Sequence, residues 1–285
     1  MDAATPVDPS SIFSAKDLVV AITGGGTGIG LAMTAAVYKT GARKVYILGR
    51  RLSVLEEAAK SLDPSGKTIV PLTCDITALA SIREAVARIE ADAGWLDVLV
   101  NNSGRIGPSN KAALEAQSIE ELRDVLLTGL TDDTLNEFNS TLITNASSVV
   151  AASASFLPLL AKGNERRGCQ IITTASIAGF NRGITAGVAY SASKAAAVHL
   201  GKILATLLVP WGVRSNVVAP GIYPSAMTGE SDAEYISSQV PLGKKGSFDD
   251  IAGLILYMVG KGGSYLNGSV QVSDGGRLSG FPSTY

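Results

Sequence analysis

A tyrosine and a lysine four positions apart, in the stretch Tyr190-Ser-Ala-Ser-Lys194, could carry acid–base chemistry. A tyrosine phenol has a pKa near ~10, which is too high for efficient proton exchange at neutral pH. Positions four apart share one face of a helix, so we expect the Lys194 ammonium to approach Tyr190 and lower its pKa. Because this spacing also occurs on purely structural helices, the pair needs support from other parts of the chain.

The second feature that could serve a chemical function is a glycine-rich turn, Thr23-Gly-Gly-Gly-Thr-Gly28-Ile-Gly30. It follows an apolar run at 18–23 and precedes a helical pattern at 28–40. Glycines let a backbone approach a pyrophosphate closely, and a helix N-terminus attracts its negative charge. Glycines alone could form an ordinary tight turn, but a strand, a glycine turn and a helix in this order predict a dinucleotide site.

The elements that must position these residues alternate along the chain. Strands are expected at 18–23, 44–49, 68–74, 96–101, 169–175, 213–218 and 269–273. Helices are expected at 28–40, 53–62, 78–93, 119–127, 146–160, 189–208 and 248–259. Since the strands are almost wholly apolar, both of their faces should be covered. This predicts an α/β fold with one doubly wound parallel sheet and helices on both faces.

Composition and charge narrow the class of protein. The chain has 285 residues, of which 46% are hydrophobic, and a net charge of -1. It can bury a large core, and it lacks the broad basic surface that holds nucleic acid. Cys74, Cys169 and the single histidine, His199, show no metal-ligand spacing, so no metal is expected. No apolar stretch approaches the roughly 18 residues of a membrane span, and the N-terminus lacks a signal-peptide pattern, so we expect a cytoplasmic protein that binds no membrane.

The chain is expected to divide into a short tail and one domain. Residues 1–15, rich in Ala, Pro, Ser and Asp, predict a flexible tail, and residues 16–285 a single domain. Two irregular segments, 105–145 and about 220–246, interrupt the alternation. We expect the second to form a substrate loop, because open α/β sheets place ligands among the loops at the carboxyl ends of their strands.

The glycine pattern TGxxxGxG resembles that of the short-chain dehydrogenase/reductases. Other stretches resemble further motifs of this family, spread over nearly the whole chain. They are Asn101-Asn-Ser-Gly104, Asn145, Ser176 with Tyr190 and Lys194, Pro220-Gly221 and Asp274-Gly-Gly276. The resemblance implies a Rossmann-type fold and hydride transfer between a nicotinamide and a carbonyl or alcohol carbon.

The resemblance also assigns roles to four catalytic residues. Tyr190 is the general acid or base, Lys194 tunes it and binds the nicotinamide ribose, and Ser176 orients the substrate oxygen. The backbone of Asn145 serves a proton relay through a water. Ser176 lies fourteen positions before Tyr190, one more than the family pattern, so the loop between them should hold an extra residue. Ser176 has the alternative role of satisfying a strand end.

NADP(H) is the expected cofactor. An NAD-binding protein usually carries an acidic residue at the end of the second strand, where this chain has Gly49 followed by Arg50 and Arg51. A guanidinium suits a 2′-phosphate, although these arginines could instead cap a helix or face solvent. Asp75 is expected at the adenine, with helix capping as its alternative role. The predicted cofactor-binding residues are Gly24, Thr27, Gly28, Ile29, Gly30, Arg50, Arg51, Asp75, Ile76, Asn101, Gly104, Tyr190, Lys194, Pro220, Gly221, Ile222 and Thr228.

The expected substrate is a hydrophobic ketone. The predicted pocket residues are mainly apolar: Ile106, Ile177, Ala178, Ile184, Tyr223 and Met227. The stretch 221–228 resembles 3-oxoacyl reductases and fungal enzymes that reduce polyketide or other natural-product ketones in secondary metabolism. Arg105 and Arg182 are the basic residues near the mouth that could hold a carboxylate.

Other functions on the same scaffold are a non-redox cyclase or isomerase, a regulator that senses NADP(H), and a pure binding or structural protein. The intact Ser-Tyr-Lys set favours an enzyme, because it would serve no purpose in a binding protein. Relatives of this family pack apolar helix faces across two-fold axes. We therefore expect a homodimer or homotetramer.

Overall fold

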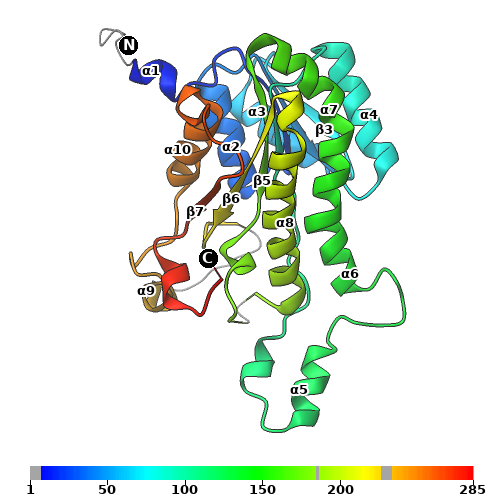
Figure 1. The fold of residues 1–285 in the computed structure, drawn as a ribbon, viewed down its shortest axis with the longest axis vertical. Coiled ribbons are helices and arrows are strands. Elements are labelled where there is room, and N and C mark those ends of the chain that lie inside the picture. The colour runs from blue at the N-terminus through cyan, green and yellow to red at the C-terminus, as the bar shows by residue number, and fades with distance from the viewer. Residues whose placement is uncertain (1–7, 184–185, 226–232, 285) are drawn as a thin grey trace.

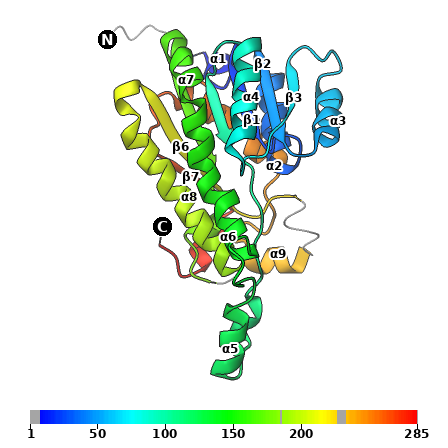
Figure 2. The same ribbon diagram turned by 90° about the vertical axis from the view of Figure 1, so that its right-hand side faces the viewer.

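A computed structural model describes residues 8–183, 186–225 and 233–284. Within them, seven parallel strands form one sheet in the order β3-β2-β1-β4-β5-β6-β7, with helices on both faces (Figures 1 and 2). The strands are β1 (Val19–Thr23), β2 (Lys44–Gly49), β3 (Ile69–Thr73), β4 (Val98–Asn101), β5 (Cys169–Thr174), β6 (Val213–Pro220) and β7 (Val270–Ser273). The predicted doubly wound parallel sheet is thereby confirmed.

Two groups of helices cover the two faces of the sheet. One group is α2 (Gly28–Lys39), α3 (Leu52–Leu62) and α10 (Phe248–Val259). The other is α4 (Leu79–Asp92), α7 (Ser148–Arg167) and α8 (Val188–Leu207). Successive strand residues point to opposite faces, so Val20 and Ile22 of β1 join the first core while Val19 and Ala21 join the second. This double burial explains why the central strands are uniformly apolar.

The remaining elements are short. They are α1 (Pro9–Ile12), α5 (Ile119–Leu126), α6 (Glu137–Leu142) and α9 (Ala233–Gln239), the π-helical turn η2 (Ile143–Ser147), and the 3-10 turns η1 (Lys111–Leu114), η3 (Ile177–Gly179), η4 (Val209–Trp211), η5 (Lys261–Gly263) and η6 (Arg277–Gly280).

The helix predicted at 146–160 is much longer in the structure. It begins at Glu137 with α6, continues through η2 and ends with α7 at Arg167. Pro158 lies inside it without ending it, because Phe156, Leu159 and Leu160 on either side are fully buried against the sheet. Residues 137–166 are also apolar enough to span a membrane by length and composition, which the sequence interpretation did not anticipate. The same composition occurs in helices that cover a sheet, and α7 packs against β4 and β5.

Ordered structure begins earlier than the expected tail boundary at residue 15. Asp8 caps α1, and its side chain accepts a hydrogen bond from the backbone N–H of Ser10. Ala15 is fully buried in the first core. Ser14 and Ala15 therefore contact the domain through Thr40, residues 8–10 stay exposed, and residues 1–7 lie outside the described part of the chain.

The segment between β4 and α6 forms an arm. Figures 1 and 2 both show α5 projecting away from the body of the molecule beyond α6 and α8. Its apolar side chains are not covered: Leu114, Ile119 and Leu135 are each about 70% exposed. Ser118 caps α5 with its side chain, which explains why the predicted helix forms here without a core to support it.

Candidate active site

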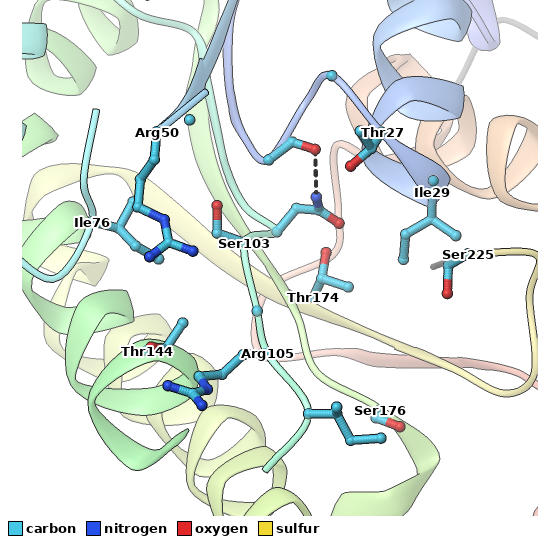
Figure 3. A pocket seen from close by; sticks show the side chains of 18 of the residues that line it. Thr27, Ile29, Arg50, Ile76, Ser103, Arg105, Thr144, Thr174, Ser176 and Ser225 are labelled. Atoms are coloured by element: carbon cyan, nitrogen blue, oxygen red, sulfur yellow. Dashed lines mark hydrogen bonds between the residues drawn. The ribbon is translucent and has the colours of Figure 1, made fainter. Parts of the chain in front are cut away.

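A cavity of about 780 Å³ lies at the carboxyl ends of the strands. The turn after β1, the ends of β2 to β6 and the first part of α8 line it (Figure 3). β1 and β4 are neighbours in the sheet, and the strand order reverses between them. Such a switch point is where open α/β sheets bind ligands, so topology places the cavity where a site is expected.

The glycine turn has the shape that a dinucleotide requires. Gly24 and Gly28 have positive φ angles of 67° and 54°, which favour glycine. A Cβ at Gly30 would overlap the Gly24 carbonyl oxygen and lie 2.5 Å from Nδ2 of Asn102. Among the described residues, no side-chain cap serves the first turn of α2, whose N-cap is Thr27. The first N–H groups of α2 therefore remain available to an anion.

Two buried polar atoms on the cavity wall support the same assignment. Oδ1 of Asn102 and Oγ1 of Thr174 have no hydrogen-bond partner within the described part of the chain. A buried polar group without a partner is costly, and a polar ligand would satisfy both. The cavity therefore fits a dinucleotide by its glycine turn and by its unpaired polar groups.

Asn102, and not Asn101, contributes to the cavity wall. Nδ2 of Asn101 donates to Oγ of Ser153 at 3.0 Å, which turns Asn101 into the core beneath α7. Asn102 is fixed against β1, because its Nδ2 donates to the Thr23 carbonyl at 2.9 Å. The structure thus does not bring the Asn101 side chain to the cavity wall, since adjacent residues at a strand end face opposite sides.

Arg50 lines the cavity at the end of β2. It follows β2 directly, and its guanidinium is drawn beside Ile76 in Figure 3. Asp75 lies close by: a hydrogen bond from the Thr77 hydroxyl, and more weakly the charge of Arg50, lower the pKa of its carboxyl group. Arg51 also lines the cavity and is the N-cap residue of α3. Asp75 does not cap α4, whose N-cap is Ala78.

Ser176, Tyr190 and Lys194 meet at the opposite end of the same cavity. Ser176 follows β5, and its side chain lies close enough to Tyr190 to affect the pKa of its hydroxyl group. The unusual spacing between them does not separate the two side chains. Lys194 is 3% exposed, and its Nζ lies 5.7 Å from the centre of the Tyr190 ring. The three side chains therefore face one cavity.

The Lys194 ammonium is bonded to one neighbour and lies close to another. Its Nζ donates to the Thr174 carbonyl at 2.9 Å, and a Cβ at Gly104 would lie 3.4 Å from it. Gly104 therefore lets the chain after β4 pass close to the ammonium. The same Cβ would lie 3.2 Å from Oδ1 of Asn145, so the four predicted catalytic residues and Gly104 form one cluster.

Asn145 lies in the π-helical turn η2, and its side chain is fully used. Oδ1 accepts from the Arg105 backbone N–H, and Nδ2 donates to the Arg105 carbonyl and to Oγ of Ser193, each at 2.9 Å. A π-turn disturbs the regular helical hydrogen bonds and is frequent at functional sites. This geometry leaves the predicted relay role to the backbone of Asn145.

The pKa of Tyr190 departs from the sequence expectation. Burial raises the pKa of the phenol, and the hydrogen bond with Ser176 lowers it by less. Burial also lowers the pKa of Lys194 to about 8. Desolvation dominates the pKa of Tyr190, and Nζ of Lys194 donates to the Thr174 carbonyl.

Only part of the predicted substrate pocket lies on the cavity wall. Ile106 and Tyr223 line it, as do Pro220 and Gly221. Ile177 and Ala178 are buried instead in the turn η3, which packs beneath α8. Ile222, which was predicted to bind the cofactor, is not a lining residue; its carbonyl accepts from the Gly246 N–H at 2.9 Å. Ile184, Met227 and Thr228 lie outside the described residues.

Sequence interpretation missed several residues of the wall. They are Gly26, Gly49, Val54, Leu55, Cys74, Thr77, Asn102, Ser103, Thr144, Thr174, Ala175 and Ser225. Most are direct neighbours of predicted residues, at strand ends. The alternation of side chains along each strand was the available signal for Asn102 and Thr174.

The chain belongs to the short-chain dehydrogenase family, whose model matches residues 18–236. It is 39% identical to the short-chain dehydrogenase/reductase PhomF of Diaporthe leptostromiformis, over 97% of this chain and 96% of that protein. It is 29% identical to the rhamnolipids biosynthesis 3-oxoacyl-[acyl-carrier-protein] reductase of Pseudomonas aeruginosa, over 93% and 97%. The chain is therefore an oxidoreductase by family.

Solved structures agree with this assignment. The Pseudomonas aeruginosa RhlG/NADP active-site complex has a TM-score of 0.79 and 27% identity, covering 94% of this chain and 99% of that one. A short-chain dehydrogenase/reductase from Mycobacterium marinum has a TM-score of 0.78 and 29% identity, covering 94% and 98%. Both likenesses extend over nearly the whole fold described above.

Proposed function

We propose that this protein reduces a ketone of a hydrophobic small molecule to an alcohol with NADPH. One observation carries the proposal: Tyr190, Ser176 and Lys194 share a cavity with the glycine turn and Arg50. The acid–base group and the predicted phosphate-binding groups thus face one continuous space. The relatives add support, since one is named a 3-oxoacyl reductase and a similar structure is a complex with NADP.

The dinucleotide would be held by the turn from Gly24 to Gly30, with Arg50 at its 2′-phosphate. When bound, it supplies the hydride. Tyr190 gives its proton to the substrate oxygen, and its raised pKa means that the phenol is protonated at neutral pH. The Ser176 hydroxyl donates a hydrogen bond to the same oxygen.

Lys194 supplies positive charge beside the phenol. Its pKa of about 8 leaves it mostly protonated at pH 7. Charge next to Tyr190 stabilises the phenolate that remains after proton transfer. The backbone of Asn145 would return a proton through a water, while its side chain is bonded to Arg105 and Ser193. Ile106 and Tyr223 give the wall its apolar character, which favours a hydrophobic substrate.

Incubation of the purified protein with NADPH and a panel of aliphatic and aromatic ketones tests the proposal. We expect NADPH oxidation, followed by its near-ultraviolet absorbance, with formation of the matching alcohol. Tyr190→Phe should lower turnover by at least about 100-fold while retaining NADPH binding, because general acid catalysis is lost. Tyr265→Phe is the matched control, since Tyr265 is 100% exposed.

Two outcomes would contradict the proposal. Full turnover by Tyr190→Phe would remove Tyr190 from the chemistry. Tight NADPH binding without oxidation on any ketone would favour a non-redox cyclase, isomerase or cofactor sensor on the same scaffold.

A further inference from the structure

Arg105 is a charged side chain on the catalytic half of the cavity wall that the proposed chemistry does not use. It directly follows Gly104, whose position is next to Nζ of Lys194. In Figure 3 its guanidinium lies beside Thr144, the residue before Asn145. Arg50, by contrast, follows β2, which β1 separates from β4 in the sheet. Arg105 is therefore placed for a substrate and Arg50 for the cofactor.

The backbone of Arg105 is rigidly placed. Both its N–H and its carbonyl are hydrogen-bonded to the Asn145 side chain, each at 2.9 Å. Asn145 is itself buried and bonded to Ser193 of α8. A cation on a fixed backbone loses less freedom when it binds a ligand, so the position is preorganised for recognition.

The guanidinium remains accessible to a ligand. Among the described residues its recorded ion partner is Glu137, with 4.0 Å between Nη2 and Oε1, and the two side chains are 40% and 65% exposed. An exposed ion pair at this separation contributes little and can yield to another anion. Arg182, the other arginine near the predicted mouth, is not a lining residue of the cavity.

We infer that Arg105 binds an anionic group of the substrate, so that the ketone is carried by an acid with an apolar chain. This inference rests on the proposed reductase function. Arg105 forms charge-assisted hydrogen bonds with a carboxylate, and Ile106 and Tyr223 cover the apolar part between that carboxylate and the ketone. Arg105 is thereby a specificity-determining residue.

The ion pair with Glu137 offers a competing structural role. Arg105 and Glu137 stand at the two ends of the arm, so their contact could simply close its base. The two roles make opposite predictions for Glu137→Gln. If the pair closes the arm, this variant should behave like Arg105→Gln. If Arg105 binds substrate, removing its competitor should preserve or raise activity on acids.

The test compares 4-, 6- and 8-oxodecanoate with their methyl esters, which differ in charge but not in the ketone. Wild-type protein should prefer at least one acid to its ester in kcat/KM. Arg105→Gln should lower kcat/KM for that acid by about 10- to 100-fold and leave the ester unchanged. Arg105→Lys should retain part of the preference, and Arg123→Gln, on the exposed face of α5, should retain all of it.

Three results would overturn the inference while the reductase function stands. They are an equal loss of kcat/KM on acid and ester in Arg105→Gln, the same loss in Glu137→Gln, and no preference of the wild-type protein for any acid. Calorimetric binding of the three acids to the protein with NADP⁺ separates the two proposals. Binding of an acid that depends on Arg105 without turnover of any ketone would sink the reductase function alone. No binding and no preference would sink the inference.

Discussion

The two ends of the cavity are built in different ways. At the cofactor end, one continuous piece of chain from Gly24 to Gly30 makes the turn, and its shape depends on glycine backbone angles. At the catalytic end, Ser176, Tyr190 and Asn145 come from three separate segments, and α8 and η2 must pack together before their side chains meet. Local geometry therefore makes the first end, and tertiary packing makes the second.

Burial separates the two ends as well. Arg50 is exposed at the cofactor end, whereas Lys194 and Asn145 are almost completely buried at the catalytic end. The buried end is where the pKa values of Tyr190 and Lys194 shift. Chemistry that depends on protonation thus belongs to the packed end, and the proposed contact with a 2′-phosphate belongs to the open end.

The largest expected effect comes from breaking the local geometry with Gly30→Ala. The new Cβ would overlap the Gly24 carbonyl oxygen, so the turn must distort. We expect a loss of about 1–3 kcal/mol in the free energy of unfolding, as for other overpacked sites, together with loss of NADPH binding. Denaturant unfolding and calorimetric titration measure the two quantities.

The matched control is Gly253→Ala in α10, where a Cβ would meet no atom within 4 Å. This change should raise stability by about 0.5–1 kcal/mol, because alanine is the better helix former. Wild-type NADPH affinity in Gly30→Ala would contradict the role given to the turn.

A smaller effect is expected from changing the charge at the end of β2, at the cofactor end of the cavity. Arg50→Met should reduce the preference for NADPH over NADH by about 10- to 100-fold, because a charge-assisted contact is lost. Gly49→Asp should shift preference further toward NADH; its Cβ would lie 3.5 Å from Leu55, an ordinary contact. The Kd values of each variant for NADPH and for NADH measure this preference. Arg123→Met serves as the control. If Gly49→Asp and Arg50→Met both kept the preference for NADPH over NADH, the end of β2 would play no part in cofactor selection.

The smallest effect concerns pH and the buried end. The pKa of Lys194 is lowered from 10.5 to about 8, so the ammonium is lost as pH rises through about 8. The reduction rate should fall above that pH. Between about pH 8 and 10.5 the unfolded chain holds the proton more tightly than the folded chain, so this group should make folding more favourable as pH rises. As pH rises above about 8, the reduction rate should therefore fall while the contribution of Lys194 to the free energy of unfolding increases.

A kcat profile and unfolding curves from pH 7 to about pH 10.5 measure both trends over the range that the Lys194 shift spans. Lys194→Met provides the reference for stability, because it lacks the titrating group. A rate that stays constant to the top of this range would show that the charge of Lys194 is not needed.

Sequence periodicity predicted most element boundaries within two residues, and α10 matched at both ends. Ser247 and Asp250 explain that success, since they cap the helix through contacts three residues apart. The helix at 146–160 was predicted too short at both ends, and Pro158 inside it does not end it because Phe156 and Leu159 are buried against the sheet. At the site, the glycine turn and the Ser-Tyr-Lys set were predictable as motifs. The orientation of Asn101 and the burial of Ile177 were not.

The sequence by itself determined the order of strands and helices, the sheet that they form and the shape of the glycine turn. These features depend on side-chain alternation and backbone angles over a few neighbouring residues. Tertiary structure alone decided that Asn102 rather than Asn101 faces the cavity, that Tyr190 keeps its proton, and that Arg105 reaches the wall while Arg182 does not. Those outcomes depend on which groups are excluded from water, and that is settled only when distant segments pack together.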